Sequence, residues 1–334
     1  MTQAPPRQAH AVCVGAFTLP SAGDVRTVRE ALAEIGRCRV LIASAHLPRS
    51  PRTPFTWQER AAMLRDSLDG AEAARVEFVP LREWFDDARN AQALQQAADA
   101  AGVARDAVRR CGPARDESMT PGDPGMRDLH PELFAADDAQ AALATLRGRV
   151  APGTAAFLQG WLGMPDHQRL REEWQQIARE RALWAAVPYP VTLVTVDAVV
   201  RAAGHVLLIR RGRHPGKGLR ALPGGFLETR ETLAHAAIRE LLEETQLDVP
   251  EAQLWACLKA VRAFDHPWRS QRNRIIVHAH FFDLPGGTLP RVQGADDAAH
   301  AEWVPVADLP GLDGQFLDDH LVILDHLLRG LGLR

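Results

Sequence analysis

The sequence predicts two α/β domains in tandem: a parallel sheet of Rossmann-like topology, and then a mixed sheet sandwiched between helices. The chain has 334 residues, which is more than one hydrophobic core usually organises. In the first half, short apolar runs alternate with amphipathic helical patterns, as in parallel sheets. The second half opens on a hairpin pattern and continues into a helix with one apolar and one acidic stripe. We therefore expect domains at residues 1–163 and 188–334, joined by a helical linker at residues 164–187.

The first domain is expected to contain parallel strands near Ala11–Gly15, Arg39–Ala43 and Arg75–Pro80. Each segment is short and mostly apolar, and a helical pattern follows the first of them. Glycine and proline crowd the segment Gly112–Gly125, which favours a mobile loop.

A charged amphipathic helix is expected to link the domains. Glycine and proline punctuate Gly160–Asp166, and the next stretch, HQRLREEWQQIARERALWAAV, predicts a helix that ends before Pro188. We expect this helix to pack across one or both domains.

The second domain is expected to begin with a β-hairpin. Pro188–Val200 and His205–Ile209 are apolar runs separated by Gly204. A later run predicts a strand at Ile275–Phe282, and a last helix is expected near Gln315–Arg329.

Three carboxylates lie on one predicted helical turn, directly after a Pro-Gly-Gly loop. Glu240 and Glu244 are i,i+4 neighbours, and Glu240 and Glu243 are i,i+3, so their side chains converge on one patch. A bound Mg²⁺ reverses the repulsion among them, because hard cations take carboxylate oxygens as ligands. The pattern favours a divalent-metal site over the alternative, a solvated acidic face.

The same segment resembles the Nudix hydrolase signature, G-x5-E-x7-R-E-U-x-E-E-x-G-U, in which U is aliphatic. One position departs, because Gln246 stands where the signature has glycine. Glycine adopts a left-handed conformation at little cost, so Gln246 predicts mild strain or a different exit turn. The resemblance implies the Nudix α/β/α sandwich for this domain. The matching positions are Gly225, Glu231, Arg239, Glu240, Leu241, Glu243, Glu244 and Leu247.

The flanking residues resemble those of the fused nicotinamide mononucleotide adenylyltransferase/Nudix proteins. The shared stretches are VTVDAVV, PGKGL-x-ALPGGFLE and FDHP-x-RS. The resemblance implies an ADP-ribose pyrophosphatase that uses Mg²⁺ or Mn²⁺ and yields AMP and ribose 5-phosphate. It also implies metal ligation by Glu240, Glu243, Glu244 and the Gly224 carbonyl, with Gly225 and a Glu231–Arg239 ion pair in support.

Many enzymes of this family carry a further carboxylate outside the helix, as a metal ligand or general base. Glu302 is the candidate here, and the alternative is an exposed residue at a strand end.

Charged residues on two polar loops are candidates for substrate contacts. Gly-rich loops let backbone N–H groups and cations approach phosphate closely, and a guanidinium group bonds two phosphate oxygens at once. The alternative for any one of them is a solvated turn. Arg220 stands where the family usually has an aromatic residue, which bears on base stacking. The candidates are Arg210, Lys217, Arg220, Asp265, Arg269, Arg272 and Arg274.

The first domain resembles the adenylyltransferase half of the fused proteins, in a degenerate form. Those enzymes carry a G-R-F-x-P-F-H-x-G-H loop, whose two histidines stabilise the transferring phosphoryl group. Here Ser21 and Asp24 replace the histidines, and Ala16 replaces the arginine. An aspartate facing a triphosphate adds repulsion where stabilisation is needed. The residues of this degenerate nucleotide site are Gly15, Phe17, Ser21, Gly23 and Asp24.

Other stretches of the first domain support the same ancestry. SPRTPFTWQER and VEFVPLREWFDD resemble family segments, whereas CGPARDES lacks the histidine and lysine of the corresponding G-H-x-K-D segment. We expect an adenylyltransferase-like domain without synthetic activity.

The composition limits which binding partners and which cellular location are expected. The formal net charge of −3 provides no broad basic field for nucleic acid. The four cysteines are scattered without CxxC spacing, and no apolar run approaches 20 residues, so a reducing cytoplasmic location is expected, away from membranes. The expected partner is a small nucleotide, with a homodimer as an open possibility.

Two alternatives to a hydrolase with a silent first domain stay open. One is a bifunctional enzyme that also makes NAD from nicotinamide mononucleotide and ATP. The other is a non-catalytic regulator that binds ADP-ribose.

Overall fold

The computed structural model describes residues 10–104, 107–111, 130–136 and 138–333. These residues form two compact units, and the chain passes from the first to the second between Trp174 and Gln175. The passage lies inside one helix, α8 (Pro165–Ala185), which covers most of the predicted linker. The domain limits expected from the sequence stay a prediction. The segment Gly112–Gly125, expected to be a loop, lies outside the described residues.

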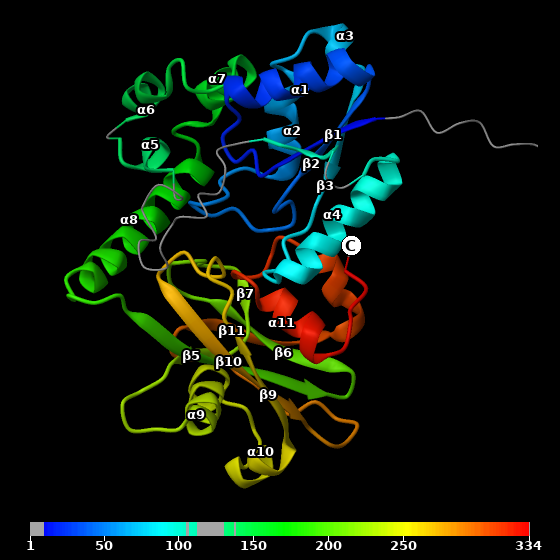
Figure 1. Cartoon of the computed structure of the whole chain (residues 1–334). Coiled ribbons are helices and arrows are strands. Elements are labelled where there is room, and N and C mark those ends of the chain that lie inside the picture. The colour runs from blue at the N-terminus through cyan, green and yellow to red at the C-terminus, as the bar shows by residue number, and fades with distance from the viewer. Residues whose placement is uncertain (1–9, 105–106, 112–129, 137, 334) are drawn as a thin grey trace, which may run out of the picture. The chain divides into compact units, whose positions relative to one another are not determined.

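A four-stranded parallel sheet organises the first unit (Figure 1). The strand order is β3-β2-β1-β4, and all three strand pairs are parallel. The expected Rossmann-like parallel sheet is therefore confirmed, with each of the three predicted strands within one residue of its place. The bounds are β1 Ala11–Gly15, β2 Cys38–Ile42, β3 Val76–Pro80 and β4 Arg109–Arg110.

Helices cover both faces of this sheet, because alternate residues of a strand point to opposite sides. Cys13 and Val40 pack with α1 (Ala22–Ile35) and α2 (Trp57–Arg65) on one face. Val12 and Leu41 pack with α4 (Asp87–Ala101) on the other. The other described helices of this unit are α3 (Gly70–Ala73), α5 (Pro131–Phe134), α6 (Ala139–Leu146) and α7 (Pro152–Trp161).

A mixed sheet organises the second unit. Its main path is β11-β6-β5-β10-β9, with β7 paired to β6 and β8 paired to β5. The pair β5–β10 is parallel and the other pairs are antiparallel. The bounds are β5 Thr192–Ala202, β6 His205–Arg211, β7 Arg220–Ala221, β8 Gly224–Phe226, β9 Leu258–Phe264, β10 Arg274–Asp283 and β11 Ala298–Pro305.

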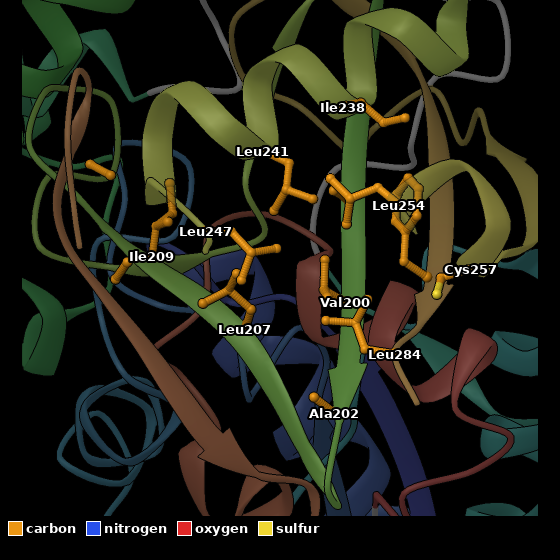
Figure 2. Packing of buried hydrophobic residues seen from close by; sticks show 14 of the residues in the cluster. Val200, Ala202, Leu207, Ile209, Ile238, Leu241, Leu247, Leu254, Cys257 and Leu284 are labelled. Carbon is orange, nitrogen blue, oxygen red and sulfur yellow. The ribbon is translucent and has the colours of Figure 1, made fainter. Parts of the chain in front are cut away.

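Each face of the mixed sheet carries its own apolar core. Figure 2 shows one of them, in which Leu241 of α9 (Leu233–Thr245) packs with Val200 of β5 and Leu207 of β6. The opposite face holds Val199 and Leu208, together with the apolar side of α11 (His320–Leu327). The sheet thus separates α9 from α11. A helix of seven residues, α10 (Glu251–Cys257), and a 3₁₀ helix, η3 (Val306–Leu312), complete the described helices of this unit.

The last helix is shorter than the predicted Gln315–Arg329. The chain before α11 pairs with β7 instead, since Arg220 N donates to Gln315 O and Leu317 N donates to Arg220 O, each at 2.8 Å. These backbone groups are committed to strand-like pairing and cannot join a helix. Within the part of the chain that the structure describes, no helix is long and apolar enough to cross a membrane.

Candidate active site

Helix α9 presents the acidic residues of the site. Thr232 caps its first turn by accepting a hydrogen bond from His235 N. The helix ends at Gln246, which adopts the left-handed conformation with φ 44° and donates its N–H to Leu242 O. Gln246 therefore takes the backbone shape that glycine adopts at lower cost, which is the mildly strained exit expected from the sequence.

Glu244 is the most deeply buried of the three glutamates, with 3% of its surface exposed. Its Oε2 accepts a hydrogen bond from Gly224 N at 2.9 Å, which ties the helix to β8. Burial, helped by the charge of Glu240, raises the pKa of Glu244 to about 8. A cation bound beside such a buried carboxyl group would stabilise its ionised form. Glu244 is therefore a candidate metal ligand.

Glu240 lies against Gly225. A methyl group at position 225 would stand 2.4 Å from Glu240 Oε1, so glycine leaves the room that this carboxylate occupies. Burial also raises the pKa of Glu240. Glu243, by contrast, has a side chain that is half exposed.

Arg239 joins the acidic residues into one network. Its Nη2 lies 2.7 Å from Glu231 Oε1, so the ion pair expected between these residues is present. Its Nη1 also donates to Glu240 Oε1 at 2.9 Å and to Glu243 Oε2 at 3.0 Å. Among the described residues, no three His, Cys, Asp or Glu side chains stand close enough to enclose a metal ion. Two of the carboxylates expected to bind the metal, those of Glu240 and Glu243, accept hydrogen bonds from Arg239 instead.

Glu302 lies apart from these glutamates. It is opposite Leu208 in the β11–β6 pair, and Leu208 belongs to the core on the α11 face of the sheet. Its Oε1 is 3.3 Å from Arg220 Nε and 3.6 Å from Arg210 Nε. The structure brings Glu302 together with two arginines and not with α9.

Asp296, a carboxylate of the loop before β11, is not among the site residues predicted from the sequence. That loop runs along the end of α9, where Gln293 N donates to Thr245 O and Ala295 N donates to Glu244 O. The charge of Asp296 contributes to the raised pKa of Glu240. The two adjacent aspartates in the stretch GADDAAH could have indicated a further carboxylate near the site.

Several of the predicted substrate cations are committed to partners within the protein. Arg269 forms a bidentate ion pair with Asp319, and their side chains are 5% and 2% exposed. Arg220 donates to Gln315 Oε1. Arg274 donates to the backbone carbonyl of Asp265. A guanidinium group that is already paired, above all the buried one of Arg269, is less available to a phosphate.

Other cations lie closer to the glutamates or to solvent. Arg272 stacks over the Phe226 ring at 4.9 Å and donates to Glu180 Oε2 at 2.6 Å. Lys217 is exposed on the Gly-rich turn. Arg211, which the candidate set omitted, is close enough to Glu244 for its charge to lower the pKa of that carboxyl.

Comparison with known proteins places the second unit in a family. Residues 191–327 match the NUDIX domain. The ADP-ribose pyrophosphatase of Methanocaldococcus jannaschii is 33% identical over 153 residues, which are 46% of this chain and 83% of that protein.

The chain belongs to the Nudix family.

Its second unit is a Nudix hydrolase domain, and α9 is the Nudix helix. A regulator is also similar to this domain: the ADPR responsive transcriptional repressor NtrR of Acinetobacter baylyi is 32% identical over 138 residues. That alignment covers 40% of this chain and 51% of the repressor, so the chain spans about half of the repressor's length.

The similarity to a solved structure extends over both units. A bifunctional NMN adenylyltransferase/ADP ribose pyrophosphatase from Francisella tularensis, complexed with AMP and a Mn ion, matches with a TM-score of 0.80 at 25% identity. The match covers 97% of this chain and 100% of that one. This Nudix protein therefore shares the two-domain fold of that enzyme.

Two residues of the predicted degenerate nucleotide site, Ser21 and Asp24, form a local cap at the start of α1. Asp24 Oδ2 accepts hydrogen bonds from Ser21 N and Ser21 Oγ, both at 2.8 Å, and Ser21 Oγ accepts one from Asp24 N. Asp24 is only 5% exposed. The two replacements thus form a capping box, which satisfies the N–H groups of Ser21 and Asp24.

The loop before this cap is tightly folded. Phe17 has a positive φ of 48°. A methyl group at Gly15 would stand 3.0 Å from the Phe17 ring, whereas one at Gly23 would meet only Ser21 Oγ, at 3.5 Å. Buried Arg60 holds the loop from behind, because its guanidinium donates to the carbonyls of Ala16, Ala43 and Ser44.

Proposed function

We propose that the Nudix domain hydrolyses the diphosphate of ADP-ribose to AMP and ribose 5-phosphate, with Mg²⁺ or Mn²⁺. The main observation behind the proposal is that two carboxylates of α9 meet the Gly224–Gly225 strand. Buried Glu244 accepts a hydrogen bond from Gly224 N, and Glu240 packs against Gly225. The names of two similar proteins, an ADP-ribose pyrophosphatase and a bifunctional enzyme with the same activity, support this substrate.

The residues of α9 suit a hard divalent cation. All the donors are carboxylate or carbonyl oxygens, which Mg²⁺ and Mn²⁺ prefer. Two of the carboxylates have raised pKa values, so a nearby positive charge would stabilise their ionised forms. We propose Glu240, Glu243 and Glu244 as ligands, with the Gly224 carbonyl as a further one, once Arg239 releases Glu240 and Glu243. A bound cation would neutralise charge on the diphosphate and acidify a water.

The remaining residues would bind and orient the substrate. Arg239 and Glu231 would hold the Nudix helix in place. Arg211 and Arg272, beside Glu244 and Phe226, are better placed for phosphate than Arg269, which is already paired. Asp296 is better placed than Glu302 to accept a proton near Glu240, because Glu302 is paired with Arg210 and Arg220. Lys217, Arg274 and Asp265 remain candidates for ribose and diphosphate contacts.

We propose that the first unit does not synthesise NAD. Its helix α1 carries the carboxylate of Asp24 in its first turn, so a triphosphate at this helix end would meet a negative charge. The bifunctional Francisella enzyme favours the second candidate, an active adenylyltransferase. The homodimer and the cytoplasmic location stay predictions.

A product assay tests the hydrolase. The purified full-length protein is incubated with ADP-ribose and Mn²⁺, and AMP and ribose 5-phosphate are separated by chromatography. We expect both products in equal amounts. Tight binding of ADP-ribose without AMP would instead support a regulator.

The same preparation tests the first unit. We expect no NAD from nicotinamide mononucleotide, ATP and Mg²⁺ above a control without ATP. NAD formation would show that Ser21 and Asp24 still permit adenylyl transfer, and the bifunctional alternative would replace this part of the proposal.

A further inference from the structure

A buried polar cluster lies on the α11 side of the Nudix sheet, opposite the Nudix helix. At its centre, Arg269 donates from Nε to Asp319 Oδ2 at 2.9 Å and from Nη2 to Asp319 Oδ1 at 2.7 Å. Arg269 comes from the loop between β9 and β10, and Asp319 immediately precedes α11. This bidentate pair fixes the start of α11, and with it the next residue, His320.

His320 holds the backbone that leads into the Gly-Gly strand. Its Nδ1 accepts a hydrogen bond from Leu222 N at 2.9 Å, and the residue is 7% exposed. Because Nδ1 is the acceptor, the ring hydrogen of the neutral imidazole is on Nε2. Burial lowers the pKa of His320 well below its ordinary value, which keeps the ring neutral.

Asp197 lies on the other side of the imidazole. Its Oδ2 is 4.0 Å from His320 Nε2, and no described residue forms a hydrogen bond with that oxygen. Asp197 is 5% exposed and pairs in register with Gly224. The Nε2 side of His320 thus lies near a buried carboxylate beside the glycine strand.

The glycine strand has little room to move. A methyl group at Gly224 would stand 2.2 Å from Val196 O and 2.6 Å from Asp197 Oδ1. On its other side, Gly224 N donates to Glu244 Oε2. A displacement at Leu222, two residues earlier, would therefore shift the N–H that orients Glu244, because close packing transmits small movements.

We propose that His320 is a positioning residue for the Nudix metal site: through Leu222 N it sets the Gly224 backbone that orients Glu244 from across the sheet. This inference rests on the proposed hydrolysis of ADP-ribose. In this proposal His320 acts through the backbone and not by direct contact with the metal or the substrate. Its effect would fall on metal affinity and on kcat, with the KM for ADP-ribose unchanged.

A matched pair of variants tests the acceptor at Nδ1. In His320→Asn, the side-chain oxygen occupies the place of Nδ1 and still accepts from Leu222 N, whereas His320→Leu fills similar space without an acceptor. We expect His320→Leu to weaken Mn²⁺ binding, measured by electron paramagnetic resonance, and to lower kcat, each by about 10- to 100-fold. His320→Asn should recover most of both losses. Wild-type Mn²⁺ affinity in the leucine variant, or equal losses in both variants, would overturn the proposal.

A replacement variant covers the case in which His320→Leu does not fold, and a wild-type assay separates the role of His320 from the proposed hydrolysis. If His320→Leu does not fold, as judged by circular dichroism, His320→Gln replaces it, because the longer side chain carries its oxygen beyond the Nδ1 position. The glutamine variant should then bind Mn²⁺ more weakly than the asparagine variant, and equal affinities would overturn the role. Wild-type protein that binds Mn²⁺ and releases no AMP would overturn the proposed function, while the affinity comparison would still decide the role of His320.

Discussion

Replacing Glu244 with Gln is expected to lower the rate of AMP release from ADP-ribose by about 100- to 1,000-fold, which corresponds to a loss of several kcal/mol of metal-assisted stabilisation. Glutamine has almost the same shape and keeps an oxygen that can accept from Gly224 N, so the Nudix fold should be unchanged. Steady-state rates at saturating Mn²⁺ measure the effect. Near wild-type hydrolysis would show that Glu244 is not a metal ligand.

Glu243→Gln is the matched control for this change. Its side chain is half exposed and bonded to Arg239. Its loss should therefore reduce the rate far less than the loss of Glu244. An equal loss in both variants would mean that the burial of Glu244 has no special part in binding the cation.

The same Glu244→Gln variant has an expected effect on stability without metal. The folded-state pKa of Glu244 is about 8, above the ordinary 4.5, so the folded protein binds a proton that the unfolded chain releases. Stability therefore falls as pH rises from about 4.5 to about 8, and glutamine removes that loss. In the presence of a chelator, the Tm of the variant should exceed that of the wild type by more at pH 8 than at pH 5. A difference that does not change with pH would contradict the burial argument.

Replacing Asp319 with Ala is expected to cost the Nudix domain about 3–5 kcal/mol of unfolding free energy, because it leaves the buried Arg269 without its counter-charge. The two side chains are 5% and 2% exposed, so the guanidinium left behind would be poorly solvated. Urea unfolding of the full-length protein measures the loss.

A double variant separates the ion pair from packing. Arg269→Met with Asp319→Leu replaces both charges by apolar groups of similar volume, which is often close to neutral. It should be clearly more stable than Asp319→Ala alone. If the single variant lost less than about 1 kcal/mol, the pair would be no stronger than an exposed one.

The sequence was sufficient for the fold and for the Nudix helix, because those features depend on local patterns. Strand periodicity, the Gly-Gly loop and the i,i+3 and i,i+4 spacing of the glutamates are all read within about twenty residues. The capping box of Ser21 and Asp24 is also local, and a serine followed three residues later by a carboxylate could have indicated it.

The partners of the charged side chains could not be read in the same way. Arg269 has its carboxylate 50 residues away in Asp319, and Arg220 has its amide 95 residues away in Gln315. An arginine paired in the core and an arginine free for phosphate have the same appearance in a sequence. The face on which Glu302 lies depends on the register of β11 against β6, which a single sequence does not fix.

The measurement that bears most directly on the central proposal is AMP release by metal-stripped full-length protein. ADP-ribose is supplied first with a chelator and then with increasing Mn²⁺ or Mg²⁺. The carboxylates of the Nudix helix predict no AMP without metal and a saturable rise when the cation returns. Undiminished AMP release from the stripped protein, or none at any metal concentration, would contradict the account.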